Sequence, residues 1–592
     1  MGRKIELKSY RKLLLQTLFV FFAASILFVI TYRIWAYDWK IPFPYTNGDG
    51  MFFSSVVKSV MKNGWYTVNP QLGAPFGRDL FDFPVFPDTS SILTIKFLSL
   101  FFDHYGYLIN FLTYFMFPMT AVISFLVMNQ LRIPFVCAAG GSLCYTFLSY
   151  RYLRILIGHF FLADYTLVPL AILILFWLWE DERFLAPERG FFKYKKNIFA
   201  ILFLLFFSLK GVYYTFFTCF FMAVVMLMCL MKKKKKNAVF PALTGIFCLV
   251  MPLVIAYLPT FFYRKEYGWN PLAPNRLPFE AENLSLELAF LVLPEQSHNI
   301  PFLQDKIEAF LPLTYAEGTA YMGMIGVLGF IILLLSLFTR GRRMNEEKLT
   351  VTGDRIHFLG LLQIFGILLG IVGGFGPLFA VLVNSQIRAY NRISVFLSFF
   401  CITGFSMAAG MFLSFLQKRK AIHICTTLAT AALFTVCILE QVYFSPLSRY
   451  AEMKAEYESD FAFVKTIEST VGEDAMIFQI PFQAFPEVPP VERMEDYSHS
   501  RGYLHSETLF WSYGAYKGRE GDMVYREMMM KPAEEYIKDA MTMGFEGLYI
   551  DTFGYTEESL SELEAVLSSM IQSEKQISRN ERFWFYDMRQ TV

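Results

Sequence analysis

A single carboxylate between two glycines, in Gly48-Asp49-Gly50, follows the first long apolar segment of the chain. A positioned carboxylate can draw the proton from an acceptor hydroxyl, which is general-base catalysis and contributes about 10² to 10⁴ in rate. The flanking glycines allow a sharp backbone turn and close approach of a substrate. We interpret Asp49 as a candidate catalytic base. The alternative is that Asp49 only caps the helix expected to start at Met51.

Further ionisable side chains stand at the ends of apolar segments or in the loops that join them. Charged groups at membrane depth cost roughly 2.5 to 3.5 kcal/mol each, so those retained at such positions are candidates for function. Cations there can stabilise the charge that develops on a phosphate leaving group. The candidate phosphate-binding residues are Arg388, Arg392, Lys210 and His159. Possible second-site or acceptor contacts are Arg78, Asp79, Asp82, Asp164, Glu295, His298 and Glu317.

These residues also have structural interpretations. The arginines and Lys210 could be interfacial side chains that extend to lipid headgroups, and His159 could be a hydrogen-bonded interfacial histidine. Glu295 and His298 could ligate a divalent metal, but two potential ligands in one loop do not define a metal site. The predicted site therefore contains no metal ligand. The cofactor stays unidentified, with a divalent metal as an open alternative.

The composition places these residues in a membrane protein. Of the 592 residues, 55% are hydrophobic and 18% are charged, and the mean hydropathy is +0.40, unlike an ordinary soluble protein. The net charge of +2 is close to neutral, so nothing favours nucleic acid as a partner. The eight cysteines lie in apolar stretches without a CxxC spacing, which argues against disulfides or zinc.

Apolar segments that cross a bilayer need roughly 20 residues, and we predict about eleven of them. They cover approximately residues 13–36, 107–129, 134–150, 161–179, 197–210, 212–231, 239–262, 319–338, 356–375, 392–416 and 421–442. Basic loops favour the cytoplasm. With the N-terminus inside, the basic loops at 132, 183–196, 232–236, 340–343 and 418–420 all become cytoplasmic. We therefore expect a multi-pass protein of the cytoplasmic membrane.

This topology predicts a transmembrane domain over residues 1–442 and an extracytoplasmic domain over residues 443–592. The transmembrane domain has two large outer loops, at residues 38–106 and 263–318. The first loop contains Asp49 and continues as an amphipathic helix over residues 51–62, which we expect on the membrane surface. An apolar helix at residues 90–102 is too short to span.

The last 150 residues read as a small soluble α/β domain. Short β-like runs occur at residues 475–481, 547–551 and 582–586, and helical patterns occur at residues 450–470, 531–543 and 556–574. This alternating order favours a sheet with helices packed on it. Asp551 follows a strand, with His499, His505 and Glu507 in a polar stretch. We interpret them as structural, with a second site as the alternative.

The plan of the chain resembles the GT-C superfamily of membrane glycosyltransferases, and more narrowly its bacterial YfhO-type members. The resemblance rests on an acidic residue in the first outer loop, Asp49, with surface helices, short cytoplasmic loops and an outer C-terminal domain, and it covers roughly residues 10–442. It implies transfer of a sugar, with inversion, from a polyprenyl-phosphate donor to an external acceptor. The paired acid in the second outer loop of many relatives has no counterpart beyond Asp164.

We therefore expect a polytopic α-helical membrane protein, GT-C-like, with a C-terminal soluble α/β domain outside. Its expected activity is glycosyl transfer from a polyprenyl-phosphate sugar donor to a cell-surface glycan or lipid acceptor, with membrane lipid around it. A transporter or flippase of lipid-linked saccharide is an alternative that predicts ionisable groups deep in the spans and pseudo-symmetric halves. A glycan polymerase or ligase is a further alternative with similar outer loops.

Overall fold

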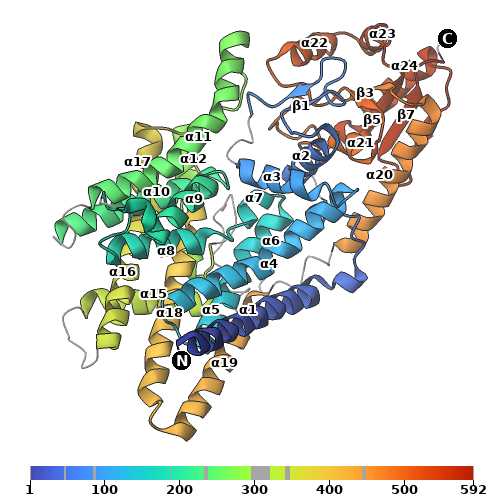
Figure 1. Ribbon diagram of the computed structural model, residues 1–592. Coiled ribbons are helices and arrows are strands. Elements are labelled where there is room, and N and C mark those ends of the chain that lie inside the picture. Colours follow the sequence, from blue (N-terminus) through green and yellow to red (C-terminus); the bar gives the residue numbers. More distant parts are fainter. Residues whose placement is uncertain are drawn as a thin grey trace.

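The computed structural model of the chain is an elongated molecule with a helical bundle at one end and a mixed α/β region at the other (Figure 1). It describes residues 2–45, 48–83, 88–187, 190–232, 238–294, 320–339, 347–442 and 449–590. The N-terminus lies at the end of the bundle, and the C-terminus lies in the α/β region. We call residues 449–590 the C-terminal region.

Among the described residues, seven helices are long and apolar enough to cross a membrane. They are α1 (Gly2–Tyr32), α4 (Tyr105–Gln130), α10 (Val212–Met231), α11 (Val239–Tyr267), α16 (Glu347–Gly370), α18 (Ser394–Leu416) and α19 (Lys420–Gln441). Shorter helices occupy the remaining predicted segments: α5 (Phe135–Thr146), α8 (Val168–Glu180), α9 (Lys195–Ser208) and α15 (Gly323–Phe338). The polytopic helical class is confirmed, while only the seven long helices meet the length for a span.

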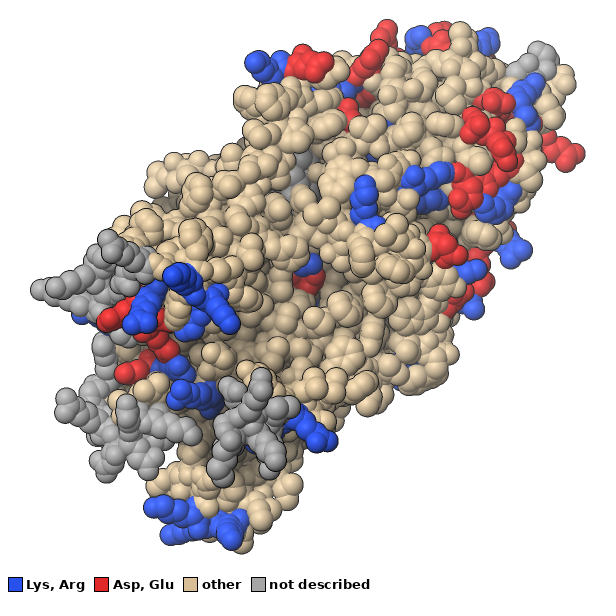
Figure 2. All heavy atoms as spheres, viewed as in Figure 1, with Lys and Arg blue, Asp and Glu red and all other residues tan. Residues whose placement is uncertain are grey.

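On the face seen in Figure 2, the exposed charged side chains gather toward two ends of the molecule. Figure 2 shows Lys, Arg, Asp and Glu over the C-terminal region at the upper right and at the opposite, lower left end, with a broad band between them that carries very few. Large apolar side chains are exposed along the long helices, including Phe247, Val254 and Phe261 of α11. A belt of this kind is what a lipid bilayer requires of the surface that faces it.

Short elements connect the long helices. They are η1 (Ile34–Ala36), α2 (Asp49–Asn63), the strands β1 (Val68–Asn69) and β2 (Arg78–Asp79), α3 (Thr89–Leu98), α6 (Ser149–Leu156), α7 (Phe160–Ala163), η3 (Phe191–Lys193), α12 (Pro278–Asn283), α13 (Ala289–Val292), α17 (Phe375–Leu382) and η4 (Tyr390–Ile393). Strands β1 and β2 pair antiparallel as a small ribbon. Helix α3 has ten residues, which agrees with its prediction as a helix too short to span.

Helix α2 is an interior element. Its apolar positions Met51, Phe53, Val56, Val57 and Val60 are all buried. The helix packs against α3 and α4 of the bundle and against α21 (Ser500–His505) of the C-terminal region, and it lies between the two parts in Figure 1. The prediction that this helix rests on the membrane surface was therefore wrong, because its apolar face is covered by protein.

The C-terminal region holds one mixed sheet of five strands in the order β4-β3-β5-β7-β6. Its elements are α20 (Tyr450–Val471), β3 (Met476–Ile480), α21, β4 (Phe510–Trp511), α22 (Glu520–Met528), α23 (Ala533–Thr542), β5 (Gly547–Asp551), η6 (Thr552–Gly554), α24 (Glu557–Met570), β6 (Gln576–Ile577) and β7 (Phe583–Asp587). β3 runs parallel to β4 and β5, whereas β7 is antiparallel to β5 and β6.

Alternating side chains give this sheet a core on each face. On one face Phe478 and Leu548 pack with apolar residues of α22, α23 and α24. On the other face Ile477 and Tyr549 pack with residues of α20. Successive strand residues point to opposite faces, so a strand with helices on both sides reads as a continuous apolar run. The short runs predicted as strands are confirmed as β3, β5 and β7.

Candidate active site

Asp49 is the first residue of α2, and its carboxylate contacts a histidine. The distance from Asp49 Oδ2 to His159 Nε2 is 2.7 Å, and the two side chains are 47% and 20% exposed. Gly48 is the N-cap residue, with φ of 70°, and offers no side chain to the first turn. The helix therefore starts at Asp49, not at Met51, and the carboxylate is engaged by His159 while still reaching solvent. Its position at a helix N-terminus also favours negative charge.

His159 is oriented by an arginine. Its Nδ1 lies 2.9 Å from an amino nitrogen of Arg154, a buried side chain whose guanidinium stands 4.9 Å from the centre of the Tyr150 ring. A guanidinium only donates hydrogen bonds, so Nδ1 must be the acceptor. The ring hydrogen is then on Nε2 and points at Asp49. Arg154 thereby selects the neutral tautomer that donates a hydrogen bond to the carboxylate.

Two glycines make this arrangement possible. Gly158, with φ of 80°, precedes His159, and a Cβ built on it would lie 2.1 Å from the backbone nitrogen of Gly50. Only glycine permits both this conformation and this contact. Beside the glycines, Phe53 of α2 stacks on Phe160 with ring centres 4.3 Å apart. The start of α2 and the turn that carries His159 are therefore pressed together backbone to backbone.

Lys210 lies between two carboxyl groups. Its ammonium is 2.5 Å from Asp164 Oδ2 and 3.2 Å from the Ser91 hydroxyl. Asp88, just before α3, is close enough to feel the same ammonium: burial raises the pKa of Asp88 to about 7, and the charge of Lys210 opposes that rise. Both partners of the ion pair are 14% exposed. The site around Lys210 is therefore already close to neutral without a ligand.

Arg388 and Arg392 have separate surroundings. Arg388 forms an ion pair with Glu280 of α12. Arg392 lies in η4, is 9% exposed, and stands 4.3 Å from the centre of the Tyr213 ring. Because α18 begins only at Ser394, it includes neither arginine, and the two do not share a face of that helix.

A further arginine connects Arg388 to the C-terminal region. Arg276 donates two hydrogen bonds to the Glu487 carboxylate, at 2.6 and 2.7 Å. Glu280 is near both Arg276 and Arg388; burial works to raise the pKa of Glu280, but its hydrogen bonds and the two cations lower it overall. A bidentate arginine–carboxylate pair fixes orientation as well as distance. Arg388, one of the cations predicted at the donor phosphate, thus belongs to a cluster that reaches the C-terminal region.

Arg78 and Asp79 hold the first loop together. Arg78 is buried and donates hydrogen bonds to the hydroxyls of Ser55 and Ser59 on α2. Asp79 accepts a hydrogen bond of 2.8 Å from the Tyr263 hydroxyl of α11. Burial lowers the pKa of Arg78 to about 10. Both residues therefore make structural contacts in the described part of the chain.

Asp82 is the centre of a buried ionic cluster. Its side chain is fully buried and lies 3.1 Å from Arg264 and 2.5 Å from Arg519. Asn270 donates a further hydrogen bond of 3.1 Å to its second oxygen. Arg264 lies in the last turn of α11 and Arg519 belongs to the C-terminal region, so one carboxylate joins three parts of the chain. Removing one member of such a buried set leaves an uncompensated charge.

Three predicted residues remain. Glu295, His298 and Glu317 lie outside the described residues. In the described ranges, no group of three or more His, Cys, Asp or Glu side chains is placed to hold a metal ion.

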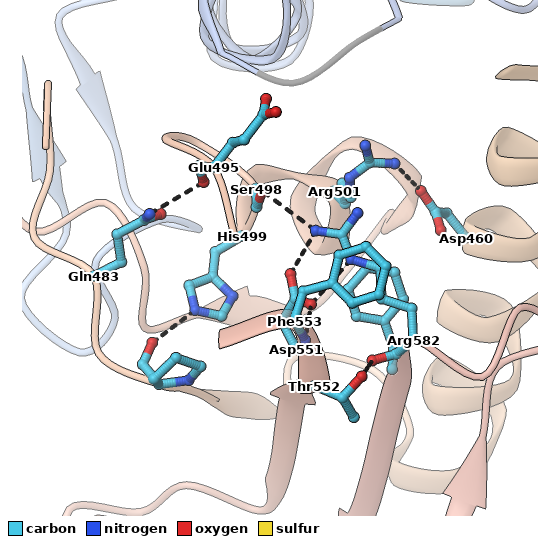
Figure 3. Close-up of polar contacts among 12 residues, drawn as sticks. Asp460, Gln483, Glu495, Ser498, His499, Arg501, Asp551, Thr552, Phe553 and Arg582 are labelled. Atoms are coloured by element: carbon cyan, nitrogen blue, oxygen red, sulfur yellow. Dashed lines mark hydrogen bonds and ion pairs between the residues drawn. The ribbon is translucent and has the colours of Figure 1, made fainter. Parts of the chain in front are cut away.

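Asp551 and Arg582 of the C-terminal region are joined by buried polar contacts (Figure 3). The buried Asp551 accepts two hydrogen bonds from Arg582, at 2.9 and 2.7 Å. Arg582 also donates to the Ser498 hydroxyl, and His499 Nε2 lies 2.9 Å from the Pro481 carbonyl oxygen. Buried groups that satisfy one another in this way rigidify a fold. This geometry favours the structural interpretation of Asp551.

One acidic residue near Asp49 was missed in the sequence. Asp496, in the loop between β3 and α21, accepts through its carbonyl oxygen a hydrogen bond of 3.2 Å from the Gly48 N–H. Its carboxyl accepts a hydrogen bond from the Val488 N–H. Burial raises the pKa of Asp496 to about 7, and the nearby charges of Asp49 and Glu487 add to that rise. Nothing in the local sequence signals this placement.

Comparison with known proteins finds distant similarity in solved structures. ArnT from Cupriavidus metallidurans bound to undecaprenyl phosphate matches with a TM-score of 0.49 and 9% identity, over 98% of this chain and 98% of that chain. The oligosaccharyltransferase AglB from Archaeoglobus fulgidus, in complex with an inhibitory peptide and a dolichol-phosphate, matches with a TM-score of 0.45 and 10% identity, over 96% and 74%. No family model and no curated protein matches. Likeness at this level does not by itself assign an activity.

Proposed function

We propose that this protein is a membrane glycosyltransferase of the GT-C type, close to the YfhO-type members, that moves a sugar from a polyprenyl-phosphate donor to an acceptor outside the cytoplasmic membrane. The observation that carries the proposal is the Asp49–His159–Arg154 array. It presents a half-exposed carboxylate whose partner, the histidine, is itself oriented by Arg154. A base held by an oriented neighbour is the arrangement that proton abstraction needs.

In the proposed reaction the acceptor oxygen forms a bond to the anomeric carbon of the donor sugar. Asp49 takes the proton from that oxygen, and the bond between the anomeric carbon and the phosphate oxygen breaks. Its electron pair goes to the lipid phosphate, which leaves as an anion. Attack from the face opposite the phosphate inverts the anomeric centre.

The leaving phosphate needs positive charge near it. Arg388 and Arg392 are the proposed contacts. Arg276 is added because it lies near Glu280, the ion-pair partner of Arg388. Lys210 and His159 stay proposed contacts of lower rank; Lys210 pairs with Asp164, and His159 pairs with the candidate base itself. A phosphate that binds here has to compete with Glu280 for Arg388, which ties donor binding to movement of that ion pair.

The proposed orientation places the C-terminal region outside the cytoplasmic membrane and divides the chain into a transmembrane domain, 1–442, and an outer domain, 443–592. The basic loops predicted on the cytoplasmic side support it through the positive-inside rule. The acceptor is proposed to be a cell-surface glycan or a lipid. A lipid-linked saccharide transporter would need no general base, so it leaves the Asp49 array unexplained.

The test is transfer by purified protein in lipid nanodiscs that is supplied with a panel of radiolabelled polyprenyl-phosphate sugars and a cell-envelope glycan fraction. We expect one donor to support transfer, and Asp49→Asn to abolish it. The matched control is Asp38→Asn, an exposed carboxylate of the same loop that bonds only locally to the Lys40 N–H. If Asp49→Asn transfers like the unmodified protein, or if flipping occurs without transfer, the proposal fails.

A further inference from the structure

The loop that carries Asp496 is held firmly from both sides. Gln483 donates a hydrogen bond of 3.1 Å to the carbonyl oxygen of Glu495, and Arg582 donates to Ser498 on the other side. Figure 3 shows these contacts in the same close-up, with Glu495 and Ser498 on one continuous turn. Residue 496 therefore sits on a short stretch of backbone fixed at both ends.

The same loop is docked on α2. The Gly48 N–H donates to the carbonyl oxygen of Asp496 at 3.2 Å, one residue before the candidate base. Phe52 of α2 packs against Tyr497 and Phe485, with ring centres 5.2 and 6.0 Å apart. Asp496 and Asp49 are thus brought together by backbone and aromatic contacts that do not involve their carboxyl groups.

The Asp496 carboxyl is incompletely satisfied. Oδ2 accepts a hydrogen bond from the Val488 N–H at 3.3 Å. Oδ1 is buried and, among the described residues, accepts no hydrogen bond of ordinary geometry, although the Tyr497 N–H is near enough to the carboxyl to lower its pKa. Buried polar atoms are nearly always paired, so an unpaired oxygen beside a candidate base calls for an explanation.

We propose that Asp496 is a second acidic residue of the Asp49 site, and that its Oδ1 hydrogen-bonds a hydroxyl of the acceptor next to the one that Asp49 deprotonates. This inference rests on the proposed glycosyl transfer. It gives the C-terminal region a direct part in binding the acceptor. It also explains why that region is locked to the first loop by the Asp82 cluster and by α2.

The charges around Asp496 favour its neutral, protonated form. Two carboxylates face it, Asp49 from α2 and Glu487 from its own loop, and Lys517, from the segment after β4, is the cation near it. Burial outweighs the hydrogen bonds from backbone N–H groups and raises the pKa of Asp496 to about 7. The neutral group donates a hydrogen bond to a sugar hydroxyl. It also keeps a second fixed negative charge away from the departing phosphate.

Two substitutions separate these roles. Asp496→Asn keeps the shape and the neutral charge, so we expect it to transfer within about threefold of the unmodified protein at pH 6. Asp496→Ala removes the hydrogen bond, so we expect its KM for the acceptor to rise about tenfold with donor KM unchanged. Glu495→Gln is the matched control, because that neighbour is exposed and the contact shown for it uses its backbone oxygen.

The pH profile is the decisive readout. With a pKa of about 7, the neutral fraction of Asp496 falls about tenfold between pH 6 and pH 8. Transfer by the unmodified protein should fall with it, and transfer by Asp496→Asn should not. Histidines titrate in the same range. If the decline of transfer with pH is lost in Asp496→Asn, the decline is assigned to Asp496 and not to a histidine. An unchanged decline in Asp496→Asn, or an unchanged acceptor KM in Asp496→Ala, overturns the proposal.

A second measurement works without any substrate. The pKa of Asp496 is raised on folding, so the unmodified protein should lose stability relative to Asp496→Asn as the pH rises from about 4 to about 7, with a constant difference above that. If no donor supports transfer, the proposed function fails on the panel assay. A flat stability difference instead shows that Asp496 is ionised throughout, and it overturns the neutral carboxyl proposed here.

Discussion

Replacing Gly158 by alanine should disable the site without removing any of its polar groups. The added Cβ would lie 2.1 Å from the Gly50 nitrogen and 2.5 Å from its Cα, where ordinary contact begins at 3.4 Å. The start of α2 must therefore retreat by about 1.3 Å, the difference between 3.4 and 2.1 Å. The left-handed backbone adds roughly 1–2 kcal/mol of strain.

Such a shift acts on the candidate base directly, because Asp49 is the neighbour of Gly50. A misplacement of about 1 Å costs about 10²-fold in rate, which corresponds to about 2.7 kcal/mol in the barrier. We therefore expect Gly158→Ala to lower kcat for transfer about 10²-fold. Donor binding, measured with the labelled polyprenyl-phosphate sugar, should stay within threefold, because the cations around Glu280 do not move.

The matched control is Gly64→Ala at the other end of α2. Gly64 has φ of 78°, close to that of Gly158, but its nearest neighbour is the flexible end of Lys96 at 3.7 Å. It carries the same backbone strain without the clash. Gly64→Ala should lose a little thermal stability and keep its kcat. Equal kcat in the two variants would refute the reasoning that links the Gly158–Gly50 contact to the placement of Asp49.

Two more predictions concern residues around the site. His159→Phe should lower kcat about 10²-fold, because it frees the Asp49 carboxylate to rotate. The control His423→Phe, at the start of α19, should keep its kcat. Single-turnover transfer measures both variants, and equal rates would show that His159 does not position Asp49. Asp82→Ala should destabilise the protein by about 3–5 kcal/mol, because Arg264 and Arg519 lose their buried counter-charge. Its unfolding temperature in detergent should fall far more than that of Asp539→Ala, which breaks an exposed pair with Lys531. A similar fall in both variants would contradict the stabilising role of the Asp82 cluster.

The sequence predicted elements whose pattern is local. Continuous apolar runs identified β3, β5 and β7, because a strand covered on both faces needs no polar residue. Helical periodicity identified α20, α23 and α24 to within a few residues. All eleven apolar segments are helical, but hydropathy cannot tell a full span from a shorter helix such as α9, which buries only part of its surface in protein.

Features set by contacts between distant segments were beyond the sequence. The apolar face of α2 looks the same whether lipid or protein covers it. Arg388 and Arg392 are four residues apart, but Arg388 precedes η4, Arg392 lies within it, and α18 begins only after it. Asp496 stands in a stretch rich in Pro and Glu without a motif, and only its docking on Gly48 brings it to Asp49.

The most direct test of the central claim measures binding and transfer in one sample of Asp49→Asn. The variant is reconstituted in nanodiscs with the radiolabelled donor that serves the unmodified protein, and bound and transferred label are counted together. If Asp49 is the base, the donor binds within about threefold of the unmodified protein, while transfer falls by about 10² or more. Transfer at the unmodified rate, with the donor equally bound, would contradict the account.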